Sequence, residues 1–212
     1  SLSEIETEMN NLRNSHCDPD AEEVMVSLQN GTEHTVYLRF IGASKGVEAR
    51  LEAAKKILGY SGKIRKATYV GEESAGIWPS LTDFGWSASD GNLLLRFICL
   101  TSKVFELTNI VKKFIEKEEL DYSFLIGFGR GNTRLLIPEN LASDKVHRMI
   151  EDLRGISASL GGYMTVERAS AEIKSSMDIW SPLGNELELM ERVKNRLDPH
   201  NILNKGRYVG GI

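Results

Sequence analysis

Residues 91–168 carry the feature that most restricts how this chain can fold, a regular succession of strand-like and helix-like apolar patterns. A nearly continuous apolar run at 93–100 predicts a central strand, because a strand covered on both faces needs no polar side. The expected order is a strand at 93–100, a helix from Ser102, strands at 122–128 and around 135–137, a helix at 143–160 and a strand at 163–168. This order is that of the ferredoxin-like split βαβ unit, so we expect an antiparallel sheet with helices on one face.

The first part of the chain shows the same patterns less completely. Alternating apolar residues near 24–28 and 36–40 flank Asn30-Gly31, which is a strong β-hairpin signal. The other expected elements are helices at 2–14, 44–58 and 72–83 and a strand at 63–70. We expect residues 33–70 to belong to a second split unit, which makes the fold class α+β with ferredoxin-like split βαβ repeats.

The composition is that of an ordinary globular protein. The 212 residues are 41% hydrophobic and 26% charged, with a net charge of −4. This negative balance argues against nucleic-acid binding, which requires a basic face. No apolar run approaches the roughly 20 residues of a transmembrane segment, and no signal peptide is recognisable. Cys17 and Cys99 lie far apart in the sequence, which fits a reduced, cytoplasmic protein.

Residues 183–212 show a separate pattern, a helix followed by a glycine-rich tail. Apolar residues three or four apart line one side of the expected helix, which ends before Pro199. These residues are Leu187, Met190, Val193 and Leu197. Asparagine and glycine residues favour turns in the tail, which Ile202, Leu203, Tyr208 and Val209 would anchor by burial. The tail packs either on its own domain or on a partner, and the residues alone leave both open.

The same end of the chain resembles a known family. The segment Asp178-Ile-Trp-Ser-Pro182 and the run Asp198-Pro-His-x-x-Leu-Asn-x-Gly-Arg207 are similar to the C-terminal part of FAD-linked oxidases of the vanillyl-alcohol-oxidase type. Within that superfamily they are most similar to the FAD-binding E subunit of bacterial glycolate oxidase. Lys205 stands where the family usually has proline.

The resemblance implies that 1–182 are a cap or substrate domain and that 183–212 pack toward an FAD domain. The chain begins with Ser1 rather than Met, and we expect the FAD domain to precede it in the full-length protein. FAD is the implied cofactor, bound mainly by that missing domain, with Asn204 and Arg207 as the cofactor-binding residues of this chain. The implied function is the C-terminal part of a flavin-dependent 2-hydroxy-acid oxidoreductase subunit, with glycolate or lactate as substrate and sister subunits as partners. The fragment alone would be inactive.

Residues 127–134 resemble a degenerate Gly-His-x-Gly-Asp-Gly-Asn-x-His segment, with which related 2-hydroxy-acid dehydrogenases hold a divalent metal. Phe128 and Arg134 stand in the two histidine places, and Arg168 follows Glu167 where those relatives have another histidine. One carboxylate without imidazoles is a poor transition-metal site. We therefore predict that the chain binds no metal.

Arginines stand near the lost metal positions and suggest a different way to hold a substrate. A guanidinium binds a carboxylate through two parallel donors and keeps its charge. The resemblance and this chemistry predict a substrate-binding site of Arg130, Asn132, Arg134 and Arg168. Alternatively, the arginines are solvated residues at strand ends, some paired with Glu167, and Asn132 is a turn residue. The catalytic base is unknown, because the four histidines are scattered in the sequence.

Two other functions stay open. The lost metal positions fit a non-catalytic structural subunit of a glycolate-oxidase-like complex. Split βαβ units also occur as stand-alone binding modules, which bind RNA through exposed aromatic residues on the sheet. Tyr122, Phe124 and Phe128 are the candidate aromatic residues, although acidic residues surround them.

Overall fold

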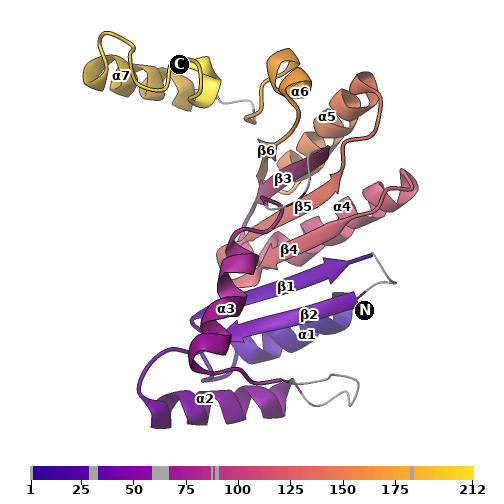
Figure 1. Ribbon diagram of the computed structural model, residues 1–212, viewed down its shortest axis with the longest axis vertical. Coiled ribbons are helices and arrows are strands. Elements are labelled where there is room, and N and C mark those ends of the chain that lie inside the picture. Colours follow the sequence, from indigo (N-terminus) through magenta and orange to yellow (C-terminus); the bar gives the residue numbers. More distant parts are fainter. Residues whose placement is uncertain (1, 29–32, 59–66, 87, 89–90, 182–183) are drawn as a thin grey trace.

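One six-stranded antiparallel sheet organises this computed structural model, which describes residues 2–28, 33–58, 67–86, 88, 91–181 and 184–212. The strands lie in the order β2-β1-β4-β5-β3-β6 (Figure 1). They are β1 (Ala21–Ser27), β2 (Glu33–Arg39), β3 (Asn92–Ile98), β4 (Ser123–Gly127), β5 (Asn132–Pro138) and β6 (Tyr163–Arg168). The α-helices are α1 (Leu2–Arg13), α2 (Ser44–Ile57), α3 (Gly71–Thr82), α4 (Val104–Lys117), α5 (Ser143–Ser159), α6 (Ala171–Ser176) and α7 (Glu186–Leu197). Short 3-10 turns are η1 (Thr101–Lys103), η2 (Phe128–Arg130) and η3 (Val209–Gly211). None of the described helices has the length and apolar character that crossing a bilayer requires.

The last four strands, with α4 and α5, form the predicted split βαβ unit. They lie side by side as β4-β5-β3-β6, and every neighbouring pair is antiparallel. β3 is central in this unit, as its nearly continuous apolar run predicted, and both of its faces are covered. The α+β fold class with an antiparallel sheet and a C-terminal helix is confirmed.

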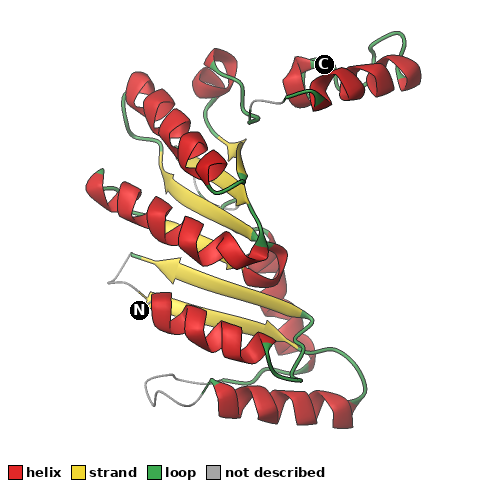
Figure 2. Ribbon diagram, turned by 180° about the vertical axis from the view of Figure 1, so that it is seen from behind, coloured by secondary structure: helices red, strands yellow, loops and turns green. Residues whose placement is uncertain are grey.

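The main core lies between the sheet and helices α1, α4 and α5, which cover the same face (Figure 2). Strand residues two apart point into it, because successive side chains of a strand alternate between the faces. Burying each apolar side chain contributes about 1.5–3 kcal/mol. The aromatic residues considered for RNA binding, Tyr122, Phe124 and Phe128, are buried in this core. Since they cannot stack on bases there, the RNA-binding hypothesis loses its structural basis.

Helix α3 crosses the opposite face of the sheet, so the helices do not all lie on one face as expected (Figure 1). The helix continues through Pro79. Leu81 and Phe84 pack against Leu94 and other strand residues in a smaller second cluster. At the end of the sheet where β4 turns into β5, Arg130 stays exposed. We call the face crossed by α3 the α3 face.

The second split unit is not completed in the residues that the structure describes. β1 and β2 form an antiparallel hairpin, which extends the sheet beside β4. Residues 67–70 are not a strand, so this part of the strand expected at 63–70 is wrong. Tyr69 and Val70, whose side chains favour strands, are exposed here. Residues 63–66 and the expected Asn30-Gly31 turn lie outside the described residues.

After β6 the chain passes through α6 and returns along the edge of the same strand. The N–H of Val166 donates to the carbonyl of Ile179 at 2.8 Å. Ser181 Oγ donates to the carbonyl of Met164 at 2.5 Å and accepts from its N–H at 2.9 Å. These bonds give the edge of β6 partners, as native sheets often require.

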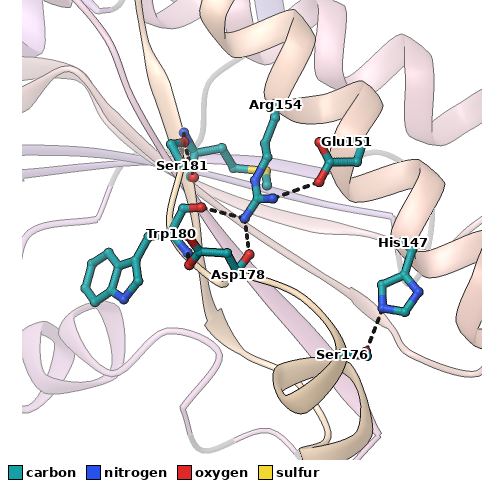
Figure 3. Close-up of polar contacts among 8 residues, drawn as sticks. His147, Glu151, Arg154, Ser176, Asp178, Trp180 and Ser181 are labelled. Carbon is teal, nitrogen blue, oxygen red and sulfur yellow. Dashed lines mark hydrogen bonds and ion pairs between the residues drawn. The ribbon is translucent and has the colours of Figure 1, made fainter. Parts of the chain in front are cut away.

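Arg154 of α5 holds this returning segment from the core side (Figure 3). Its Nη2 donates to the carbonyl oxygens of Asp178 and, at 2.7 Å, Trp180. Its Nη1 pairs with Glu151 at 2.8 Å. Residues 178–181, the first part of the segment that resembles the family, therefore connect the last strand to α5.

Helix α7 and the tail stand away from the sheet in both views (Figures 1 and 2). No residue of α7 is buried. The tail turns back along its own helix, and a Cβ on Gly210 would lie 2.4 Å from Leu187 Cδ1. Of the four residues that we expected to be buried, Ile202, Leu203 and Tyr208 are exposed and Val209 is half-buried. The tail thus packs on α7 and not on the sheet.

Candidate functional site

Three of the four predicted substrate-binding residues lie close together at the α3 face. Asn132 lies opposite Gly127 of β4, and Arg134 lies opposite Arg96 of β3. Residues two apart on a strand share a face, so Asn132 and Arg134 point the same way. Arg130 lies in η2, directly before β5. The split unit therefore brings these three residues to one end of the α3 face.

Arg134 shares a carboxylate with an arginine on the neighbouring strand. Its Nε lies 3.0 Å from Glu167 Oε2, and Arg96 Nη1 lies 3.5 Å from Glu167 Oε1. The Arg134–Glu167 contact is an ion pair without hydrogen-bond geometry. Arg134 Nη1 also donates to the carbonyl of Thr82 at 2.9 Å. One carboxylate thus faces two guanidinium groups, which leaves an excess of positive charge here.

Arg130 pairs with a buried carboxylate on β1. Its Nη2 donates to Glu23 Oε1, and the Arg130 side chain is 65% exposed while that of Glu23 is 5% exposed. Burial raises the pKa of the Glu23 carboxyl above its ordinary value, against the opposing charges of Arg130 and Arg134. The site therefore contains a carboxylate that is costly to keep charged.

Asn132 and Arg130 both lie over a position that has no side chain. A Cβ on Gly127 would lie 2.0 Å from Asn132 Oδ1 and 3.3 Å from Arg130 Nε. Any larger residue at 127 would push the amide of Asn132 aside. Gly127 thus contributes to the site because its lack of a side chain leaves room for Asn132 and Arg130.

Arg168 contacts other residues than the three predicted residues described above. Its register partner on β3 is Leu94, and its Nη1 donates to the carbonyl oxygens of Gly85, Trp86 and Ala88 at 3.1, 3.2 and 2.7 Å. These bonds tie the end of β6 to the loop after α3. A substrate-binding role for Arg168 stays a prediction, and its visible contacts are structural.

Phe128 and Arg134, the two positions that the resemblance matches to metal-binding histidines, have different surroundings. We call Arg96, Arg130, Arg134, Glu23 and Glu167 the charged group. Arg134 belongs to this group, whereas Phe128 is buried against Phe105 with ring centroids 5.0 Å apart. Arg13 lies over the Phe128 ring at 4.4 Å. Within the described part of the chain, no three His, Cys, Asp or Glu residues gather as metal ligands. The absence of a metal stays a prediction.

The predicted cofactor-binding residues Asn204 and Arg207 are exposed on the tail. Asp198, at the end of α7, holds the tail by accepting from the N–H groups of Ile202 and Leu203, both at 2.9 Å. These bonds fix where the tail leaves the helix. The N–H of Arg207 donates to the carbonyl of Asn204 at 2.9 Å, which closes a turn within the tail.

Three of the four histidines supply no evident base. His147 hydrogen bonds with Ser176 at 2.8 Å (Figure 3). His34 lies on β2, where burial lowers its pKa. His200 is exposed beside the tail. None of these three belongs to the charged group around Arg134.

Two members of the charged group were not singled out from the sequence. Arg96 had a usable signal, because it is the one charged residue in the apolar run 93–100. An ionisable residue in a buried strand needs a partner, and that partner is Glu167. Glu23 had no such signal, since it follows another glutamate in an ordinary strand pattern.

Comparison with known proteins identifies the chain over most of its length. The model of the family "FAD linked oxidases, C-terminal domain" matches residues 20–208. No curated protein matches the chain. The match covers the whole sheet, the charged group, α7 and the tail up to Tyr208. The chain therefore belongs to the FAD-linked oxidases, as their C-terminal domain.

Proposed function

We propose that the chain is the substrate-side, C-terminal part of an oxidoreductase subunit that oxidises a small 2-hydroxy acid such as glycolate or lactate. Family membership makes it part of a flavin-dependent oxidoreductase. The substrate is our proposal, and one observation carries it. Three guanidinium groups, those of Arg96, Arg130 and Arg134, gather on the α3 face with two carboxylates, for a net charge of +1.

This charge suits the carboxylate that all 2-hydroxy acids share. Arg130 is exposed, so it can turn toward a ligand, and an arginine can bind a carboxylate through two donors. Asn132 can donate to the ligand hydroxyl or accept from it. Flavin, when bound, supplies the hydride acceptor. The part of this chain is to bind the acid and to orient it.

The tail is suited to contact one edge of a flavin nucleotide, and not to enclose the nucleotide. Asn204 and Arg207 are exposed, and an amide and a guanidinium offer donors for phosphate or ring oxygens. We propose that both residues contact FAD that is held mainly by another domain. The exposed apolar residues Leu189, Val193 and Leu197 of α7 fit packing of 183–212 toward that domain.

The proposed setting is a cytoplasmic complex with sister subunits. Cys17 and Cys99 are free thiols, as is usual in a reducing compartment. Exposed apolar residues on α7 also suit a protein neighbour. Purification of the intact complex, followed by identification of its subunits, tests this part of the proposal.

Anaerobic titration of the full-length protein tests the function itself. We expect a yellow protein whose flavin absorption bleaches on addition of glycolate or lactate. Arg134→Met should raise KM by roughly tenfold or more, because it removes a charge-assisted contact of about 1.5–3 kcal/mol. Arg148→Met is the control, since Arg148 is an exposed residue of α5. A colourless full-length protein would contradict the flavin role, and an unchanged KM would contradict the site.

A second candidate is a non-catalytic structural subunit of the same kind of complex. One observation favours it: Phe128, in a histidine place, is buried in the core and cannot reach a ligand. The same titration separates the two candidates. Reduction of flavin by a 2-hydroxy acid in the isolated full-length subunit would exclude the structural role.

A further inference from the structure

Glu23 lies beneath the exposed end of Arg130, and the proposed function leaves its chemistry unused. One oxygen, Oε1, accepts from Arg130. The other, Oε2, is buried and has no hydrogen-bond partner among the described residues. Burying a charge with one oxygen unpaired costs free energy. This cost weakens the ion pair between Glu23 and Arg130. A ligand anion that makes more hydrogen bonds to Arg130 can therefore replace Glu23.

The charged groups around Glu23 are few. Arg130 faces it from η2 and Arg134 from β5, and both lower its pKa. Tyr37 lies opposite it on β2. Arg39, farther along β2, lies over an aromatic ring of α3 at 5.4 Å. Burial outweighs both arginines, so the pKa of Glu23 is raised from the ordinary 4.5.

We propose that Glu23 is the resident counter-anion of this site, which a carboxylate ligand displaces from Arg130 and which takes up a proton as the ligand binds. The inference rests on the proposed function, because it treats Arg130 as a ligand-binding residue. The ligand enters as an anion, and one proton from solvent bonds to a carboxyl oxygen of Glu23. The net charge of the site is therefore the same before and after binding.

Displacement makes ligand binding depend on pH. With a ligand anion nearby and Arg130 withdrawn, the pKa of Glu23 rises further. Between its pKa in the free chain and its higher pKa in the complex, affinity falls as pH rises, by at most about tenfold per pH unit. Outside this window Glu23 has the same charge in both states, so affinity is flat. The ligand carboxylate stays ionised above about pH 5.

Calorimetric titration of the 212-residue chain with glycolate between pH 5.5 and 8 tests the proposal. Each titration is run in two buffers that differ in ionisation heat, which gives the number of protons taken up per ligand. We expect tighter binding at the lower pH and uptake approaching one proton within the window. This measurement needs no variant, so it does not depend on how a substitution folds.

Two neighbouring glutamates provide the variant and its control. Glu23→Gln should bind glycolate with an affinity that stays the same between pH 5.5 and 8, and it should take up no proton. Glu22→Gln should behave like the unaltered chain. Glu22 is the preceding residue of β1, points to the other face and also has a raised pKa, mainly through burial.

The outcomes separate this inference from the proposed function. Binding without proton uptake, or a Glu23→Gln variant that keeps the pH dependence, would overturn the inference alone. Absence of carboxylate binding by both the unaltered chain and Glu23→Gln would also overturn it. A third result would contradict the proposed function and leave the inference standing. In that result glycolate binding depends on Glu23, but no 2-hydroxy acid reduces the flavin of the full-length protein.

Discussion

Gly131 shows how a single residue sets the position of the charged group. Its φ is +63°, and a Cβ there would lie 2.2 Å from the carbonyl oxygen of Cys99. The N–H of Cys99 donates to the carbonyl of Gly131 at 2.9 Å. The turn that carries Arg130 and starts β5 at Asn132 therefore requires glycine, for its backbone conformation and for space.

Gly131→Ala should destabilise the chain by at least about 1–2 kcal/mol, which is the cost of the left-handed conformation before the clash is added. Denaturant unfolding measures the loss. Gly129→Ala is the matched control, because Gly129 is exposed, has an ordinary φ, and would place its Cβ 3.4 Å from the end of Glu22. An equal loss in both variants would show that residue 131 needs no glycine.

At the scale of elements, side chains from helices hold segments that have little packing of their own. The segment after α6 is held by the strand edge and by Arg154 of α5 (Figure 3). The tail is held by Asp198 and by Lys194, whose Nζ reaches Asp198 Oδ2 at 2.5 Å and the carbonyl of Leu203 at 2.6 Å. Both ties use charge-assisted hydrogen bonds, which are stronger than neutral ones.

Arg154→Met should destabilise the chain by about 2–3 kcal/mol, because it removes charge-assisted hydrogen bonds to two backbone carbonyls. The ion pair with Glu151 adds little, since the Glu151 side chain is 62% exposed. Arg148→Met, on the same helix but exposed, should change the free energy of unfolding by less than about 0.5 kcal/mol. Thermal unfolding of the two variants makes the comparison. Equal melting temperatures would contradict the role of Arg154.

The tie at the end of α7 should weaken only at very low pH. Lys194 and the N–H groups of Ile202 and Leu203 lower the pKa of Asp198 from 3.8 to about 2. Because the folded pKa is depressed, this stabilisation is complete above pH 3.8 and is lost as pH falls through about 2. The amide chemical shifts of Ile202 and Leu203, followed by NMR, should report the transition.

Asp198→Asn should shift the same two amides already at neutral pH, since an amide has one acceptor oxygen in place of two. Glu191→Gln, an exposed change on α7, is the control. A transition centred near pH 4 in the unaltered chain would show that Asp198 is not held by these partners.

At the scale of the whole molecule, the sheet has one closed face and one face that is only partly covered. Helices α1, α4 and α5 close the first face (Figure 2), and α3 crosses the second. Helix α7 stands apart, with Leu189, Val193 and Leu197 exposed along one side. Both the α3 face and α7 therefore present surface that a neighbouring domain can cover.

Val193→Asp in the full-length protein should lower its flavin content, because it places a charge in the proposed contact with the FAD domain. The same change in the 212-residue chain should alter the free energy of unfolding by less than about 0.5 kcal/mol, since Val193 is exposed there. Asn195→Asp adds the same charge to another exposed position of α7. Flavin absorbance per protein is the measurement. Equal flavin loss in both variants would point to a general effect of charge.

The periodicity of single segments determined much of the fold. Apolar spacing identified α4, α5 and α7 and the strands β3, β4 and β6, because those patterns depend only on the geometry of one element. The split βαβ order followed, since its loops are short and its helices must return over the sheet. The strand expected at 63–70 was wrong at 67–70, the part that the structure describes, because an extended segment becomes a strand only beside a partner, and the sequence does not show whether a partner exists.

The sequence by itself determined the fold class, the split unit and the family resemblance, and it placed Arg130, Asn132 and Arg134 on or beside one hairpin. Only the tertiary structure decided that Glu23 and Glu167 pair with these arginines, that Phe128 turns into the core and that α3 crosses the second face. The physical reason is the distance in sequence between the residues that interact. Local patterns follow from neighbours in the chain. The contacts of β5 with residues of β1 and β6 depend instead on the order of the strands and on the register of the strand that lies between them.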